Sequence, residues 1–431
     1  MSRKPIPLTA AVLFVLNTMI GGGLFINPKQ LAAVAGALSP IGYVIAALIM
    51  LPLILVIADL ARLQPVSGGI YVYSKTYLNS FAGFISGWAY FLSKTTSAAF
   101  LLHTVNTFFC NHSAALQSIP PLLLDGLLIF LFAGFHIVGM TIGGTIQYVF
   151  SLMKFTPLIF GFIAGFVTFD KTNLTALPSE FSLTTLTTIL PVCIYALVGF
   201  EIICSIGSLI ENPSRNIRRT ILIAFGFVSI VAISFQTLMF GSLGTPLAQM
   251  TEPMFALASK FLFPHLFFAK IMNGLVFAAI SGGAFFMIGS NCWNVHTLAK
   301  NGHLPFANLL TKVNRFGAPW VALLVHACTS ITMIGISSKQ LPLQNMVVFG
   351  LFGAFFMSSL AAVQAKRKGL LNLPLITPIL AIGTCSYILT ICLNNIIQFG
   401  ISTSFLSFFI GGGILALYMH FTTTVKQENQ P

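Results

Sequence analysis

Apolar stretches of about 20 residues recur along almost the whole chain, and this recurrence constrains the fold more than any other feature. A helix of about 20 apolar residues crosses the roughly 30 Å hydrocarbon core of a bilayer. Twelve stretches occur, at residues 8–35, 38–60, 80–105, 120–139, 146–168, 186–210, 219–242, 268–297, 319–337, 344–364, 373–395 and 402–421. Only 7% of the residues are charged, against about a quarter in soluble domains. The sequence therefore predicts an all-α membrane protein with twelve transmembrane helices.

The formal net charge of +13 could indicate a nucleic-acid partner, but the positions of the basic residues favour a membrane topology. If the N-terminus is cytoplasmic, most of the 21 lysine and arginine residues fall in cytoplasmic loops and tails, among them Arg215, Arg218 and Lys366-Arg367-Lys368. Cytoplasmic loops of membrane proteins carry such an excess. We therefore expect both termini in the cytoplasm, a lipid bilayer around the chain and no nucleic-acid partner.

No pattern in the sequence is typical of a cofactor or metal site. The seven cysteines lack metal-ligand or redox spacing, and no two acidic residues lie together in the predicted spans. An intramembrane enzyme needs paired acids, a Ser/His arrangement or a metal cluster. We therefore expect no cofactor, no metal and no enzymatic activity. A sensor that binds its ligand without moving it is an alternative, although no soluble output domain is evident.

Three successive glycines, Gly21-Gly22-Gly23, interrupt the first predicted span. Each weakens a helix by about 1 kcal/mol relative to alanine, so we expect the helix to unwind there. The N–H groups of Gly22, Gly23 and Leu24 would then be unpaired at the positive end of the following half-helix, which suits a carboxylate. The alternative is close helix packing, which small residues permit in membranes.

The sixth predicted span contains a second candidate break, at Gly199 and the acidic Glu201. Because the two broken spans are five apart, they would belong to inverted five-helix repeats and meet near the bilayer centre. Carbonyls of Met19, Tyr195 and Val198 would be exposed there and suit an ammonium group. We therefore expect one zwitterion to occupy both sets of groups. The predicted substrate-binding residues are thus Met19, Gly21, Gly22, Gly23, Tyr195 and Val198.

These repeats would be residues 8–168 and 186–364, followed by two additional helices in residues 373–421. Together they would form a single transporter domain over residues 1–431.

Four motifs then occur in the right order at the right spans: Gly21–Phe25, Pro65–Tyr73, Gly199–Glu201 leading to Glu211–Asn216, and Leu298–Pro305. Together they resemble the amino acid-polyamine-organocation transporter superfamily, particularly its bacterial amino acid permease and antiporter branch. The resemblance implies a leucine-transporter-type fold with alternating access, a bacterial inner membrane and an amino acid as the substrate.

By the same resemblance, Gly22 and Gly23 would bind the α-carboxylate, while Tyr195 would stack over the substrate as an occluding gate. The sequence departs from the family where Gly22 replaces a common serine and where an arginine near the end of the eighth span is missing. The substrate side chain therefore stays open, and the alternative is a permease for a polyamine or another organic cation. Uptake versus exchange and the oligomeric state, a homodimer included, also stay open.

Lys154 lies in the middle of the fifth span, where a central lysine costs about 2.5–3.5 kcal/mol. The neutral amine is cheaper to bury than the ammonium, so Lys154 could load and release a proton. The resemblance agrees, because proton-coupled members carry a lysine at this place. The alternative is a permanently charged lysine tethered to carbonyls at the broken end of the first span.

Three further charges lie in or near the spans. Glu201 could carry a proton, or could be a neutral acid bonded to backbone groups freed at Gly199. Lys94 in the third span could face an aqueous pathway or extend toward an interface. Asp59, near Arg62 at the inner end of the second span, is predicted to be a cytoplasmic gate or a charge that anchors the loop, and not a substrate ligand.

Overall fold

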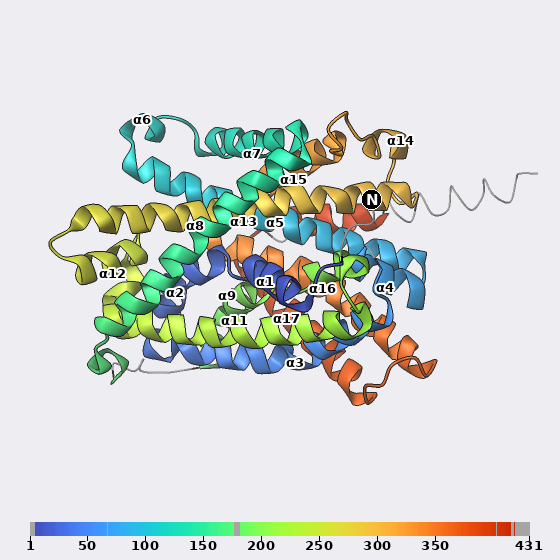
Figure 1. The fold of residues 1–431 in the computed structure, drawn as a ribbon, viewed down its shortest axis with the longest axis horizontal. Coiled ribbons are helices and arrows are strands. Elements are labelled where there is room, and N and C mark those ends of the chain that lie inside the picture. Colours follow the sequence, from blue (N-terminus) through green and yellow to red (C-terminus); the bar gives the residue numbers. More distant parts are fainter. Residues whose placement is uncertain (1–4, 67, 176–181, 402, 415–417, 419–431) are drawn as a thin grey trace, which may run out of the picture.

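The computed structural model describes residues 5–66, 68–175, 182–401, 403–414 and 418. These residues form helices and connecting loops, with one isolated bridge between Ile6 and Ile210. The predicted all-α class is therefore confirmed for this part of the chain. In Figure 1, α3, α11, α13 and α5 run roughly along one direction, and α8 crosses them obliquely.

Among the described residues, nine helices are uninterrupted and correspond to nine of the predicted spans. They are α3 (Ser39–Leu63), α5 (Ser80–His112), α7 (Pro121–Val138), α8 (Met140–Val167), α11 (Pro213–Leu243), α13 (Leu266–Lys300), α15 (Trp320–Ile336), α16 (Gln340–Arg367) and α17 (Ile376–Gln398). Most extend a few residues beyond the predicted ends.

The first and sixth predicted spans are each divided into two helices. The first forms α1 (Leu8–Met19) and α2 (Gly22–Ala35), and the sixth forms α9 (Leu183–Leu197) and α10 (Ile202–Ser205). Both breaks therefore lie where the glycines predicted them.

Shorter helices connect the long ones. They are α4 (Gly69–Tyr77), α6 (Ala114–Gln117), α12 (Pro253–Leu262), α14 (Ala307–Leu310), and the 3₁₀ turns η1 (Gly36–Leu38), η2 (Lys171–Thr175), η3 (Gly207–Leu209) and η4 (Thr245–Gln249). The predicted twelfth span, 402–421, lies partly outside the described residues, and its described part is helical over Thr403–Ile414.

Seven segments of the described chain are long and apolar enough to cross a membrane: Gly22–Leu63, Pro121–Val138, Gly143–Val167, Pro213–Leu243, Leu266–Lys300, Gln340–Arg367 and Ile376–Gln398. Other apolar helices, such as α1, α9 and α15, are shorter. The count of twelve spans and the division into two inverted repeats therefore stay predictions.

Many large apolar side chains lie on the outer surface, while several charged side chains are buried among the helices. Large apolar side chains such as Phe166, Ile230 and Leu127 are exposed, at 77%, 66% and 58%. Lys94, Lys154 and Glu201, in contrast, are at most 6% exposed. Such an arrangement suits a lipid environment, where polar side chains face the bundle interior.

Candidate functional site

The break in the first span places two helix ends next to each other. α1 ends at Met19, Gly21 is extended, and α2 begins at Gly22. The last carbonyls of α1 and the first N–H groups of α2, including those of Gly22 and Gly23, therefore lie at helix ends. Leu24 differs from our expectation, because its N–H donates to the Gly21 carbonyl at 3.3 Å in the first turn of α2. The prediction that Leu24 is unpaired is therefore wrong.

The break in the sixth span depends on Gly199 and Glu201. Gly199 has φ +117°, a conformation that residues with a Cβ rarely adopt. In a continuous helix its N–H would bond to the Tyr195 carbonyl, but it donates instead to Oε2 of Glu201 at 2.8 Å. The Tyr195 carbonyl thus loses its usual helical donor at the end of α9.

The two breaks meet at a small cavity, which we call the central cavity. Its volume is about 40 Å³, enough for a few water molecules. All six residues predicted to bind substrate line it: Met19, Gly21, Gly22, Gly23, Tyr195 and Val198. α5, α13 and α16 complete the wall, with Lys94, Ser97, Met287 and Leu351 among others.

The Tyr195 ring is held firmly beside this cavity. Its hydroxyl lies 3.1 Å from the hydroxyl of Ser97, and its ring packs edge-on against Phe100 at 5.3 Å between ring centroids. Tyr195 as a whole is 9% exposed. This position is compatible with the predicted gate over a substrate. The gating role of Tyr195 stays a prediction.

The glycines also allow close packing, as the alternative interpretation required. A Cβ at Gly22 would lie 2.5 Å from Leu101 Cδ2, and one at Gly23 would lie 3.1 Å from the Ala196 Cα. At Gly21 the nearest atom would be 3.9 Å away. Gly23 therefore allows a close approach of backbone to backbone, whereas the neighbour of Gly22 is the movable end of a leucine side chain. The packing and binding interpretations are compatible.

Lys154 of α8 reaches the broken end of α1. Its Nζ donates to the Asn17 carbonyl at 2.5 Å and to Asn17 Oδ1 at 3.0 Å. In a continuous helix this carbonyl would accept from the Gly21 N–H. Asn17 Nδ2 in turn donates to the Ser151 hydroxyl at 2.8 Å. These contacts are those expected of a tethered lysine, and they also place an ionisable group directly at the break.

Glu201 forms an ion pair with Lys94, a lysine whose role could not be decided from the sequence. Lys94 Nζ lies 2.5 Å from Glu201 Oε1, and the ammonium lies 5.2 Å from the centroid of the Tyr90 ring. The carboxylate of Glu201 therefore makes two contacts. It accepts the hydrogen bond from the Gly199 backbone that we considered for a neutral acid, and it also forms the ion pair with Lys94. Its charge partner is Lys94 of α5, whereas Lys154 contacts α1.

Asp59 lies away from the central cavity and connects two helices. Its Oδ1 lies 3.1 Å from Arg218 Nε on α11 and 3.6 Å from Arg62 Nε on its own helix, α3. Asp59 is only 2% exposed. The contact joins α3 to the first turns of α11, and the predicted gating role stays a prediction.

Two of the four sequence motifs contact each other at α4. The Tyr71 hydroxyl, in the second motif, lies 3.0 Å from His303 Nε2, in the fourth. Burial raises the pKa of Tyr71 to about 12, so its hydroxyl keeps its proton at neutral pH and can donate to the imidazole. This hydrogen bond holds the loop helix α4 against the segment that follows α13.

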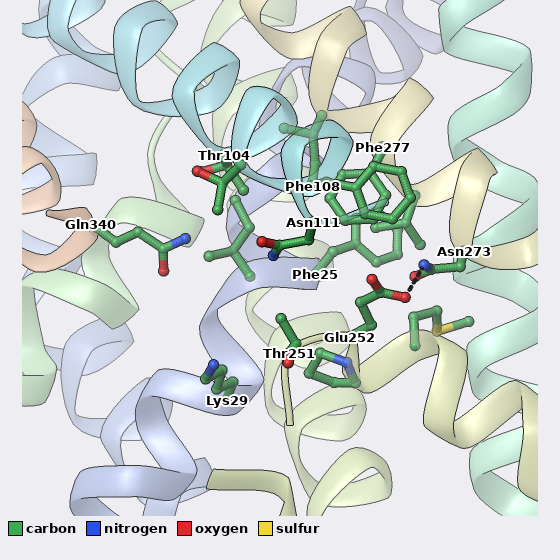
Figure 2. Close-up of a pocket in the computed structure, with 16 residues that line it drawn as sticks. Phe25, Lys29, Thr104, Phe108, Asn111, Thr251, Glu252, Asn273, Phe277 and Gln340 are labelled. Carbon is green, nitrogen blue, oxygen red and sulfur yellow. Dashed lines mark hydrogen bonds between the residues drawn. The ribbon is translucent and has the colours of Figure 1, made fainter. Parts of the chain in front are cut away.

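Two larger cavities lie on either side of the central one. The Lys29 cavity, of about 160 Å³, is lined by α2, the C-terminal part of α5 and the N-terminal part of α13. Figure 2 shows Lys29, Thr104 and Glu252 around it, with Asn273 donating to Glu252 at 2.7 Å. The Trp293 cavity, of about 390 Å³, is lined by Phe14 of α1, α10 and the opposite ends of α5 and α13.

The three cavities follow one line through the molecule. Along α5 the lining residues run from Tyr90 at the Trp293 cavity, through Ser97 at the central cavity, to Asn111 at the Lys29 cavity. At 1.5 Å per residue this path is about 30 Å long, which is the thickness of a hydrocarbon core. The helix breaks thus lie between the two ends of a series of cavities of membrane length.

Comparison with known proteins identifies the family. The family model described as amino acid permease matches residues 6–419. The chain belongs to the amino acid permease family. It is therefore an integral, multi-pass membrane protein of a transporter family, as both the resemblance and the apolar helices predicted.

The permease has bacterial relatives with named substrates. The serine/threonine exchanger SteT of Bacillus subtilis is 23% identical over 404 residues, which cover 90% of each chain. The arginine/agmatine antiporter of Chlamydia felis is 28% identical over 352 residues, covering 75% of this permease and 70% of the relative. An arginine/ornithine antiporter of Latilactobacillus sakei is 29% identical over 245 residues, covering 53% and 50%.

Proposed function

We propose that this permease is a secondary active transporter that moves an amino acid by alternating access through the central cavity. The observation that carries the proposal is the meeting of two broken helices at this cavity. The start of α2 presents N–H groups and a positive dipole end, which suit the α-carboxylate on Gly22 and Gly23. The ends of α1 and α9 present carbonyls of Met19, Tyr195 and Val198, which suit the α-amino group.

The proposal extends to the fold of the whole chain. We propose twelve spans in two inverted five-helix repeats, with α1/α2 and α9/α10 at equivalent places, two additional helices at the end and one transporter domain over residues 1–431. Both termini would face the cytoplasm of a bacterium. The cavities on either side of the central one support this proposal, because alternating access requires a route to the binding site from each membrane face.

The coupling is proposed to use Lys154 and Glu201. Each is a buried ionisable group bonded to backbone at one of the two breaks, so a change in its protonation would alter the contacts that hold the break. The relatives' names include exchangers and antiporters. Proton-driven transport and exchange of one amino acid for another are therefore the two modes that we propose to test.

The test is transport by the purified permease in proteoliposomes. A panel of labelled amino acids is offered with a proton gradient, with a sodium gradient, or with an internal amino acid, each in turn. We expect at least one amino acid to accumulate with the proton gradient or the internal amino acid, and sodium to have no effect. Accumulation driven by sodium would contradict the proposed coupling, and failure to move or bind any amino acid would contradict the proposed function.

A further inference from the structure

The ion pair between Lys94 and Glu201 is oriented so that its two charges face different surroundings. Lys94 lines both the central cavity and the Trp293 cavity. Glu201 is not among the described residues that line the central cavity, and its carboxylate is buried with a side-chain exposure of 0%. A molecule in the central cavity would therefore meet the cation of the pair before it met the anion.

Both oxygens of Glu201 already have partners. Oε1 accepts from Lys94 at 2.5 Å, and Oε2 accepts from the Gly199 N–H at 2.8 Å. An ammonium has three donors, and Lys94 gives one to Glu201, so it can donate to a ligand while keeping the pair. The glutamate, in contrast, could accept a second cation only by giving up bonds that hold the break in the sixth span.

The groups proposed for the α-carboxylate and the α-amino group are backbone groups of the two breaks. Lys94 is the charged side chain among the described residues of the cavity wall, so it is the group placed to interact with the substrate's own side chain. The cavity is also small, at about 40 Å³, and Leu101, Met287 and Leu351 form apolar parts of its wall. A short side chain fits this space better than a long one.

We propose that Lys94 is a specificity-determining residue that selects amino acids with an oxygen acceptor on a short side chain and rejects amino acids with a basic side chain. This inference rests on the proposed function, because it assumes that the substrate's α-groups bind at the two breaks. A cationic side chain would lie close to the Lys94 ammonium, where like charges oppose each other in a weakly solvated space. An oxygen acceptor would instead receive a hydrogen bond strengthened by the charge of the donor. Specificity of this kind comes from an unfavourable contact with the wrong ligand as much as from a favourable one with the right ligand.

The test compares two amino acids of almost equal shape, homoserine and 2,4-diaminobutyrate. Their side chains have the same length and end in a neutral hydroxyl or in an ammonium. Binding to the purified permease and exchange in proteoliposomes are measured for both. We expect the unmodified permease to prefer homoserine by at least about tenfold, which corresponds to about 1.4 kcal/mol.

Three variants separate the effect of charge from the effect of shape. In Lys94→Met the cation is removed and Glu201 loses its partner, so we expect the preference to shift toward diaminobutyrate by at least about tenfold. In Lys94→Met/Glu201→Gln both charges are removed, and the two ligands should be handled within about threefold of each other. Lys94→Arg keeps the cation and should keep the preference for homoserine. Size-exclusion profiles in detergent identify variants that do not fold.

Equal handling of homoserine and diaminobutyrate by the unmodified permease would overturn the inference and leave the proposed function intact. A preference for homoserine that persists in a folded double variant would also overturn it. If the unmodified permease neither binds nor exchanges any amino acid of the panel, the proposed function itself fails and the inference fails with it.

Discussion

Single residues at the two breaks determine which backbone groups could bind a ligand. A Cβ at Gly23 would lie 3.1 Å from the Ala196 Cα, so a side chain there requires α2 and α9 to shift apart slightly. Lys154 supplies the Asn17 carbonyl with a donor. Each residue therefore has a structural and a proposed functional role, and substitutions must be designed to separate the two.

Gly23→Val should abolish transport. The new side chain would occupy the space between α2 and Tyr195, where a Cβ alone already lies 3.2 Å from the Tyr195 ring. The matched control is Gly335→Val in α15, where no atom lies within 4 Å of the added Cβ. Exchange in proteoliposomes and the amount of folded protein in the membrane are measured for both. Full transport by Gly23→Val would show that the close approach is dispensable.

Lys154→Ala tests coupling against tethering. If Lys154 carries the coupled proton, the variant should lose accumulation driven by a proton gradient while exchange between equal concentrations continues. If Lys154 only holds the end of α1, both activities should fall together. Lys270→Ala removes an exposed lysine from α13 and serves as the control. Proton-driven accumulation that survives in Lys154→Ala would contradict the proposed coupling.

At the scale of elements, the helix breaks could be predicted from sequence and their side-chain contacts could not. The break at Gly21–Gly23 could be predicted from the glycines, because low helix propensity is a local property of the sequence. Lys94 and Glu201 are 107 positions apart, and no local pattern pairs them. The polar run Ser93–Ser97 in an otherwise apolar span was the available signal that this part of α5 faces a polar space. The helices α4 and α12, with 9 and 10 residues, are too short for a search based on membrane length.

Gly199→Ala should destabilise the break in the sixth span. At φ +117° a Cβ is strained, and it would lie 3.3 Å from the Met19 Cα. We expect a cost of about 1–2 kcal/mol, seen as a lower temperature of thermal unfolding in detergent. Gly274→Ala places the same methyl group in open space on α13 and should be neutral or stabilising. Equal unfolding temperatures for the two variants would contradict a special backbone at Gly199.

Asp59→Asn tests whether the contact between α3 and α11 is a gate. Loss of the charge weakens the contact with Arg218, so we expect slower turnover with an unchanged dissociation constant for the substrate, because Asp59 does not line the central cavity. Arg219→Gln removes an adjacent exposed charge that forms no ion pair among the described residues and is the control. A changed dissociation constant with normal turnover would contradict gating.

For the whole molecule, apolar length predicted the class and most helix positions, since the bilayer imposes one length on every spanning helix. It could not predict the line of three cavities, which depends on how α5 and α13 pack against the broken helices. The orientation of the chain in the membrane is inferred only from the placement of basic residues and requires its own test.

Single cysteines introduced into a cysteine-free permease should report this orientation. We expect Lys368→Cys, after α16, to react with a membrane-impermeant thiol reagent only from the cytoplasmic side, and Lys339→Cys, before α16, only from the outside. Both lysines are exposed in the structure. The reverse pattern would invert the proposed topology.

The most direct test of the account is an experimental structure of the permease with its transported amino acid bound. The α-carboxylate should lie within hydrogen-bonding distance of the Gly22 and Gly23 N–H groups, with the α-amino group at the carbonyls of Met19, Tyr195 or Val198. An amino acid bound in the Lys29 or Trp293 cavity alone, or one whose carboxylate avoids the start of α2, would contradict the proposed site.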